Sequence, residues 1–571
     1  MREGRAIHGS PHAGARSLIE EKFSFPSWRT SEGYMRRSVH EMSHVKGSSV
    51  NGYSSSGNDR GLTKVFEEHS RYPDVVRGTN QRWVGRPEYV CIVRSTAQVV
   101  EAVQTAVRNN KRISVRSGGH CYEDFVYRPD VDVVIDMSEM GRVEYDEQRR
   151  AFSVEPGSSL LNLYETLYRC WGVTLPGGMC HSVGAGGLIA GGGYGLLSRR
   201  SGLAADHLHA VEVVVVDDQG RARAVVATSD EADPGHDLWW AHTGGGGGNF
   251  GIVTKYWLRS PETSRAEPSG QLPRPPGEVL LSDVSWDWES MTEASFSRLL
   301  QNFGTWHERN SGPDSPYAGL CANLQLNHRS NGQIGLLTQV DASEPDAEQL
   351  LEEFLAAVND GVGIETGAVT TPMGDQPPRP QLAAPRRLPW LQAAQMLGTG
   401  NPALVNPTLR AEYKSAYMRS AFPQDQISAI YRHLTRDDYK NSDALLLVIS
   451  YGGRINTKSP HETATVHRDS VMKLLYENFW DDAHEDEYHL TWIREFYHDV
   501  YSRTGGVPQQ NEVNDGCYVN YADADLNDPH WNTSDSAWSD LYYGANYQRL
   551  KEVKRRWDPV GVFQHRQSVE P

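Results

Sequence analysis

The sequence is poor in cysteine and in basic residues. Only 6 of its 571 residues are cysteine and none forms a Cys-x-x-Cys pair, which argues against a disulfide framework or a zinc ribbon and favours a reducing compartment. Lys and Arg total 56 against 73 Asp and Glu, a formal net charge of −17. A surface that follows nucleic-acid phosphates needs the opposite sign, so nucleic acid is not an expected partner.

Long apolar runs are also missing. No segment reaches the roughly 18 consecutive apolar residues of a transmembrane helix, so no membrane partner is expected. The segment after Met1 lacks the apolar core of a secretory signal, and we therefore expect a cytoplasmic protein. Residues 484–489 contain His, Glu and Asp, but a charge run of this kind is typical of a solvated face, and no metal site is predicted.

Aromatic residues, by contrast, are plentiful. The chain has 15 Trp, 26 Tyr and 13 Phe, and 38% of its residues are hydrophobic. This composition is that of a globular protein with a large core, and it allows an aromatic-lined pocket for an organic ligand. At about 100–200 residues per domain, the length predicts two to four domains.

The hydrophobic pattern divides the chain into four parts. Residues 1–65 are polar and rich in Gly and Ser near their end, which predicts a flexible or peripheral arm. Residues 66–260 alternate short β-branched runs with amphipathic stretches, as in the strand at 89–93 followed by a helix at 96–110, and are interpreted as a domain built from βαβ units.

A Pro- and Ser-rich linker begins near residue 260. Residues 261–515 then contain strands such as 279–286, 320–327 and 333–341 with long amphipathic helices between them. This order predicts an antiparallel sheet with helices on one face, and so an α+β second domain. Residues 516–571 end in a short basic helix stopped by Asp558-Pro559 and are interpreted as a C-terminal segment that returns to the first domain.

Three glycine-rich segments lie in the first domain, at residues 116–120, 184–195 and 244–251. Glycine lets backbone amides approach a phosphate closely, so such clusters favour a cofactor that carries phosphate. None of the three is a GxGxxG motif that opens a helix after a strand, so a nicotinamide-binding Rossmann domain is not indicated.

Two of these segments resemble the cofactor anchors of a known family. VRSGGHCYEDF around His120 and PGGMCHSVGAGGLIAGGGYGLLSRRSG around Cys180 are similar to the motifs of berberine-bridge-enzyme-like FAD oxidases, in the vanillyl-alcohol-oxidase superfamily. The tail segments YVNYAD and NYQRLKEVKRRWDPVGVF extend the resemblance from about residue 70 to the end. Within the family, LWWAHTGGGGGNFGIVTKYW most resembles hexose oxidases of glycopeptide-antibiotic biosynthesis.

The resemblance implies a PCMH-type FAD-binding domain, a substrate domain and FAD held by two covalent bonds, one to His120 and one to Cys180. It also implies that Val183 is the small residue that lets dioxygen reach the reduced flavin. The other residues expected to bind the cofactor are Arg116, Ser117, Gly118, Gly119, Gly178, Gly184, Gly187, Gly191, Gly192, Gly193, Asn249, Gly251, Val253 and Asn520.

Oxidation of an alcohol also requires a base for the hydroxyl proton, and a tyrosine is a poor base unless neighbouring groups stabilise its phenolate. Tyr518 is the first candidate. On a strand, Tyr518 and Asn520 would share one face and Tyr521 would point to the other. The further candidates for the substrate side are Tyr451, Tyr476 and Tyr194.

These observations predict a two-domain FAD oxidase that oxidises a hydroxyl group of a sugar or glycosylated natural product and passes the electrons to dioxygen, making hydrogen peroxide. One alternative is a flavin-dependent cyclase or amine oxidase acting on an alkaloid or polyketide. An alternative of another class is a binding protein that retains the fold without redox turnover. The sequence does not select a substrate, because loops that carry no motif form the pocket.

Overall fold

The computed structural model describes residues 61–261, 267–343, 345–401 and 406–571. Residues 61–571 form one compact unit. Most of the arm predicted for residues 1–65 lies outside the described residues. Its last residues do not, because strand β1 (Thr63–Phe66) pairs with β2 (Tyr89–Ile92) and so starts the first sheet before residue 66.

The first sheet has the strand order β1-β2-β4-β3, in which β3 (Ile113–Arg116) and β4 (Val133–Asp136) continue the parallel pairing that β2 begins. Helix α2 (Thr96–Arg108) connects β2 to β3 and starts at Ser95, whose side chain accepts a hydrogen bond from the Gln98 amide. This βαβ unit confirms the sequence pattern. It also delivers the end of β3 directly into the glycine-rich segment 116–120.

The second sheet has five antiparallel strands in the order β5-β6-β9-β7-β8. Helices α3 (Leu160–Trp171), α4 (Ala185–Ala190) and α6 (His236–Ala241) come from the connections between its strands. The second and third glycine-rich segments belong to these connections. The strands are β5 (Val143–Asp146), β6 (Ala151–Val154), β7 (Leu208–Val216), β8 (Ala222–Thr228) and β9 (Ile252–Leu258).

The third sheet is antiparallel and has eight strands, with β14 paired to β10 beside the path β13-β10-β12-β11-β16-β17-β15. Its strands are β10 (Glu278–Asp287), β11 (Leu320–Asn327), β12 (Gln333–Asp341), β13 (Gly367–Ala368), β14 (Arg386–Pro389), β15 (Arg410–Met418), β16 (Ala444–Ser450) and β17 (Met472–Trp480). The predicted second domain therefore has the expected α+β architecture, although the domain boundaries themselves stay predictions.

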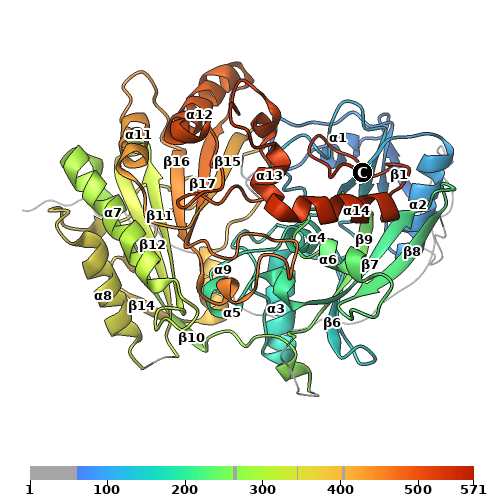
Figure 1. The fold of residues 1–571 in the computed structure, drawn as a ribbon, viewed down its shortest axis with the longest axis horizontal. Coiled ribbons are helices and arrows are strands. Elements are labelled where there is room, and N and C mark those ends of the chain that lie inside the picture. Colours follow the sequence, from blue (N-terminus) through green and yellow to red (C-terminus); the bar gives the residue numbers. More distant parts are fainter. Residues whose placement is uncertain (1–60, 262–266, 344, 402–405) are drawn as a thin grey trace, which may run out of the picture. The chain divides into compact units, whose positions relative to one another are not determined.

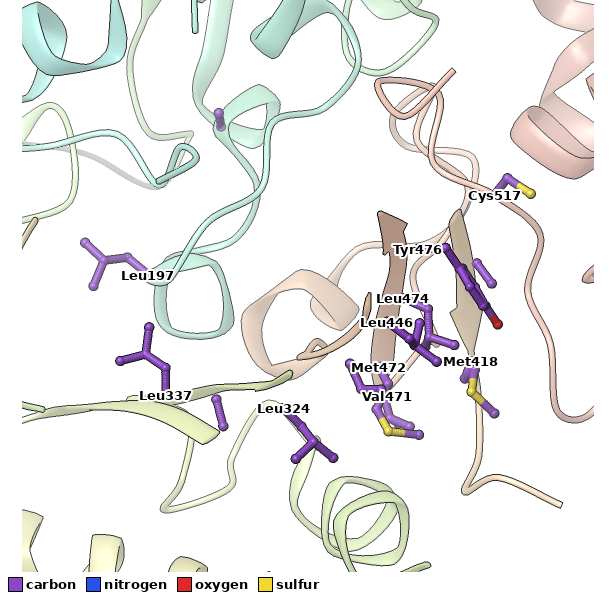
Figure 2. Close-up of a cluster of buried hydrophobic side chains, with 14 of the residues drawn as sticks. Leu197, Leu324, Leu337, Met418, Leu446, Val471, Met472, Leu474, Tyr476 and Cys517 are labelled. Atoms are coloured by element: carbon purple, nitrogen blue, oxygen red, sulfur yellow. The ribbon is translucent and has the colours of Figure 1, made fainter. Parts of the chain in front are cut away.

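Four long helices form a layer beside this sheet, with α8 against β12 and α12 against β17 (Figure 1). They are α7 (Glu293–Asn310), α8 (Ala347–Asn359), α11 (Gln424–Leu434) and α12 (Asp486–Val500). The helices pack on one face of the sheet because alternate strand residues, such as Leu324, Leu446 and Leu474, point toward them. Figure 2 shows this apolar layer, with Tyr476 beside Leu446, Leu474 and Met418. These helices do not cover the other face of the sheet, which is therefore available to form a binding site.

The C-terminal segment contacts the region that the sequence analysis assigned to the first domain. Helix α14 (Tyr547–Trp557) packs against α6, where the Trp557 indole donates a hydrogen bond to Asp237 at 3.2 Å (Figure 1). The expected strand at residues 518–521 is wrong: this segment is a turn in which the Tyr521 amide donates to the Tyr518 carbonyl at 2.9 Å. In the described part of the chain, no helix has the length and apolar character needed to cross a membrane.

Candidate active site

A cavity of about 430 Å³ joins the glycine-rich segments, the free face of the eight-stranded sheet and the C-terminal segment. Most of the residues that the sequence analysis proposed contribute to its wall. They are Arg116, Ser117, Gly118, Gly119, His120, Gly178, Cys180, Val183, Gly184, Gly187, Tyr194, Asn249, Gly251, Val253, Tyr518 and Asn520. The structure thus brings together segments from Arg116 to Asn520, which lie far apart in the chain.

The two anchor loops are packed against each other. A Cβ atom on Gly118 would lie 2.3 Å from the Gly184 amide nitrogen, so only glycine fits where the loops meet. His120 Nε2 and Cys180 Sγ then lie 2.8 Å and 3.6 Å from the same hydroxyl, that of Ser182. Burial, with a smaller contribution from the charge of Arg116, lowers the pKa of His120 to about 4. The imidazole is therefore neutral, as a nucleophilic histidine must be.

The inner half of the cavity, lined by the glycine-rich segments and by residues 563–567, has the properties of a cradle for a large cofactor. A side chain on Gly187 would meet nothing within 4 Å, and one on Gly247 would come no closer than 3.9 Å to the Gly187 Cα. Arg116 Nε, His565 Nε2 and Gln567 Oε1 are buried there without a hydrogen-bond partner in the described structure. Such atoms require a polar ligand, because burying a polar group without a partner is costly. These residues fit FAD.

Tyr518 is held by two donors to its phenolic oxygen. Asn520 Nδ2 lies 3.0 Å and the Gly193 amide nitrogen 3.2 Å from Tyr518 Oη. Burial raises the pKa of Tyr518 to about 12, and both hydrogen bonds act in the opposite direction. Donors aimed at an oxygen stabilise its anionic form, so this geometry is suited to a phenolate. The sequence analysis expected Asn520 to touch the cofactor and did not foresee its bond to Tyr518.

Lys473 of β17 was missed by the sequence analysis. Its side chain is fully buried, and its Nζ has no hydrogen-bond partner in the described structure. The Nζ lies 3.8 Å from the ring centre of Tyr518 and 4.0 Å from that of Tyr521. Burial lowers the pKa of Lys473 well below its ordinary value, so the amine gains a proton at low cost only when a negative charge forms beside it. A Tyr518 phenolate is such a charge.

The structure treats the three other tyrosine candidates differently. Tyr194 lines the cavity, and its ring stacks on Tyr451 with 5.4 Å between ring centres. Tyr451 itself does not reach the cavity, because it is fully buried behind Tyr194 and donates a hydrogen bond to the His467 carbonyl. Tyr476 lies in the apolar layer with Leu446 and Leu474 (Figure 2). Its hydroxyl donates a hydrogen bond to that of Tyr501 at 3.1 Å. We therefore correct the placement of Tyr451 and Tyr476 on the substrate side.

Three of the expected cofactor-binding glycines do not line the cavity. Gly191, Gly192 and Gly193 lie behind its wall. A Cβ on Gly191 would lie 2.1 Å from Asn520 Oδ1, and Gly193 supplies the amide that holds Tyr518. These glycines pack against the turn that carries Tyr518 and Asn520. The sequence analysis expected them to contact the cofactor directly, and the structure places them behind the residues that line the cavity.

The outer half of the cavity is formed by the eight-stranded sheet and the turn at 518–521. Three tyrosine rings are stacked there, with ring-centre distances of 3.6 Å from Tyr122 to Tyr413 and 5.4 Å from Tyr122 to Tyr521. The carboxyl groups of Asp375 and Glu477 also contribute to this wall. The sequence analysis did not name Tyr122, Tyr413, Asp375 or Glu477. It wrongly expected Tyr521 to point away from Tyr518, whereas both rings line the cavity with 4.9 Å between their centres.

Two family models match the chain. One describes an FAD binding domain and matches residues 87–223, and the other is described as berberine and berberine like and matches residues 517–570. The first match covers two of the three glycine-rich segments, at 116–120 and 184–195, and the second covers the segment that carries Tyr518. Fold and site together define a flavoprotein oxidase with a PCMH-type FAD-binding domain.

Individual relatives agree with this class. The chain is 47% identical over 513 residues to the aclacinomycin-N/aclacinomycin-A oxidase of Streptomyces galilaeus, covering 89% of this chain and 90% of the relative. It is 49% identical to the flavoenzyme CrmK of caerulomycin biosynthesis, with a TM-score of 0.85 and coverage of 90% and 100%. It is 46% identical to the glycopeptide hexose oxidase DBV29, with a TM-score of 0.83 and coverage of 90% and 99%.

The chain belongs to the berberine-bridge-enzyme-like family of FAD-linked oxidases. It is an FAD-dependent oxidase that acts on CH–OH groups with oxygen as the acceptor. The alternative of a binding protein without redox turnover is thereby set aside.

Proposed function

We propose that this enzyme oxidises a hydroxyl-bearing carbon of a sugar or glycosylated natural product in antibiotic biosynthesis, with Tyr518 as the base. The observation that carries the proposal is the pair of donors on Tyr518 Oη, from Asn520 and Gly193. As the substrate hydroxyl loses its proton, the phenolic oxygen accepts it. The two donors and the nearby Lys473 amine favour the ionised form that is needed before transfer.

The cofactor is proposed to be bonded to both His120 and Cys180. The support is that both side chains line the inner half of the cavity and are within 3.6 Å of the Ser182 hydroxyl, while their loops are locked together at Gly118 and Gly184. When bound, FAD supplies a hydride acceptor that returns two electrons to dioxygen and so yields hydrogen peroxide. His120 and Cys180 would orient the cofactor, because two bonds from separate loops would hold the flavin ring in one orientation beside Tyr518.

Support for a glycosylated substrate comes from the relatives and from the cavity. The names of two relatives refer to aclacinomycin and to glycopeptide hexose oxidation, and one of these structures contains teicoplanin. The outer half of the cavity combines tyrosine faces with Asn323 and Gln325, which are groups suited to stacking on sugar rings and bonding hydroxyls.

Peroxide release from glycosides tests the proposal. We expect purified holoenzyme to produce one hydrogen peroxide per hydroxyl oxidised when it is screened against sugars and aryl or polyketide glycosides. The product should carry a new carbonyl group detectable by mass spectrometry as the loss of two hydrogens. Turnover of alkaloids with ring closure, and none of glycosides, would show that the cyclase alternative is correct.

A further inference from the structure

The outer half of the cavity is acidic. Glu477 of β17 and Asp375 both line it, and the described lining residues between 320 and 480 include no Lys or Arg. Lys473 lies on the same strand, but it is four residues from Glu477, about 13 Å at 3.3 Å per residue. Its amine is directed at the rings of Tyr518 and Tyr521 instead. Arg379, behind the wall, acts on Asp375 and donates a hydrogen bond to Gln376, but it is not among the residues that line the cavity. The two carboxyl groups therefore face the cavity without a Lys or Arg of this sheet region beside them in its described lining.

Glu477 is buried and unpaired. The residue is 8% exposed, and within the described part of the chain its carboxyl group makes no hydrogen bond or ion pair. A Cβ on Gly374 would lie 3.5 Å from Glu477 Oε2, which places the backbone next to Asp375 against this carboxyl group. Burial, and then the charge of Asp375, raises the pKa of Glu477 well above its usual value. A buried carboxyl group without a partner is rare in proteins unless a bound ligand supplies the hydrogen-bond donor or positive charge that it lacks.

The three stacked rings of Tyr122, Tyr413 and Tyr521 form the adjoining wall. The Glu477 carboxyl group and these three rings line the same cavity. Burial raises the pKa of each tyrosine most, and the charge of Glu477 adds a smaller increase in each case. The face of an aromatic ring attracts a cation, and so does a carboxylate. Rings and carboxyl groups around an empty volume make up a site for a positively charged group.

We propose that the outer half of the cavity binds a protonated amine on the substrate, so that the preferred substrate is a glycoside carrying an amino or alkylamino group. This inference rests on the proposed function. The amine is held by Glu477, Asp375 and the tyrosine rings and is not itself oxidised. Neutral sugar hydroxyls would bond to the carboxyl groups but would leave two like charges side by side, whereas one cation relieves the repulsion of both.

The test uses holoenzyme and matched phenyl glycosides. Each set carries an amine at carbon 2, 3 or 4 of the sugar, together with the N-acetyl and the hydroxyl counterpart. Binding is read anaerobically from the change in flavin absorbance, and oxidation from peroxide release. The variants are Glu477→Gln and Asp375→Asn, which keep side-chain size, with Glu352→Gln on the exposed face of α8 as the control.

We expect the best amine to bind at least about tenfold more tightly than its N-acetyl counterpart, as a charge-assisted contact should. Glu477→Gln should abolish that preference while changing the affinity of the N-acetyl compound less than twofold, and Asp375→Asn should weaken the preference. Glu352→Gln should preserve it. Equal binding of amine and N-acetyl compounds in all three sets, or an unchanged preference in Glu477→Gln, would overturn the inference.

The proposed function can fail separately. If no glycoside yields peroxide but the binding preference depends on Glu477, the cation site stands and the reaction assignment falls. If glycosides yield peroxide and the amine has no effect on affinity, the reaction assignment stands and the cation site falls. Release of ammonia or loss of the amino group in the product would also overturn the inference, because it makes the amine the reacting group.

Discussion

Replacing Tyr518 by Phe removes one oxygen atom from the site and leaves the ring in place. The change deletes the acceptor of two hydrogen bonds, at 3.0 Å from Asn520 and 3.2 Å from the Gly193 amide. Asn520 keeps a second acceptor, the Leu188 carbonyl at 3.1 Å, so only the Gly193 amide loses its partner. The stability cost should be that of one buried donor left unpaired, about 1–3 kcal/mol.

The catalytic cost should be larger. General-base assistance is typically worth about 100- to 10,000-fold, or roughly 3–5 kcal/mol at 1.36 kcal/mol per decade. Anaerobic flavin reduction by substrate should therefore slow by at least about 100-fold in Tyr518→Phe. The wild-type rate should also rise with pH, because burial raises the pKa of Tyr518 to about 12 and the ionised fraction increases throughout the range below that value. Tyr518→Phe should lose this pH dependence.

Stopped-flow absorbance under anaerobic conditions measures the reduction step directly. Tyr476→Phe is the matched control, because it also removes one buried hydroxyl, bonded to Tyr501 at 3.1 Å, but on the helix-facing side of the sheet. It should lower the unfolding temperature by a similar amount and leave the reduction rate within about twofold of wild type. A Tyr518→Phe rate within about fivefold of wild type, or the same pH profile in both proteins, would refute the assignment of the base.

Three further predictions concern the cofactor. His120→Ala and Cys180→Ala should each retain flavin on the denatured protein through the other residue, and the double variant should release it; free flavin from denatured wild type would contradict the double linkage. Val183→Leu should slow reoxidation of the reduced flavin by dioxygen severalfold in stopped flow and leave anaerobic reduction by substrate intact. Val183 lines the cavity, and the added methylene narrows the route by which dioxygen reaches the flavin. Gly187→Val should cut flavin absorbance per polypeptide severalfold because its side chain fills the open cradle, whereas Gly277→Val, outside the cavity, should not; equal loading would show that the cradle is elsewhere.

The elements that carry strong periodicity were predictable from the sequence. The βαβ unit at residues 89–116 and the strands β10, β11, β12 and β16 follow from their apolar runs and turn residues. The anchor residues His120 and Cys180 were implied by the resemblance of two glycine-rich motifs to a known family. The glycines of these motifs, Gly118 and Gly184, are the residues at which the two loops meet. Long-range packing then only had to bring two such loops together.

The substrate side was harder to predict because its residues belong to strands that look like core. Strand β17 is buried along its whole length, and the period of two assigns Tyr476 to the helix layer and Lys473 and Glu477 to the opposite face. On that face Glu477 lines the cavity, and the Lys473 amine lies over the ring of Tyr518. The available indication was the presence of two charged residues, four apart, in a strand whose other residues are apolar or aromatic except for Asn478. The strand predicted at Tyr518 was wrong because the alternation of residue types in YVNY is compatible with a turn as well as with a strand.

Within single strands of the eight-stranded sheet, positions that determine substrate specificity alternate with positions that determine the stability of the core. Along β17, substitutions at Leu475 or Glu477 change what the cavity accepts, while substitutions at Leu474 or Tyr476 change how firmly the helices are held. Because successive positions alternate between these roles, a relative could acquire a new substrate by changing every second residue of a few strands without disturbing the core. Libraries for altering specificity should follow the same rule and randomise cavity-facing positions only.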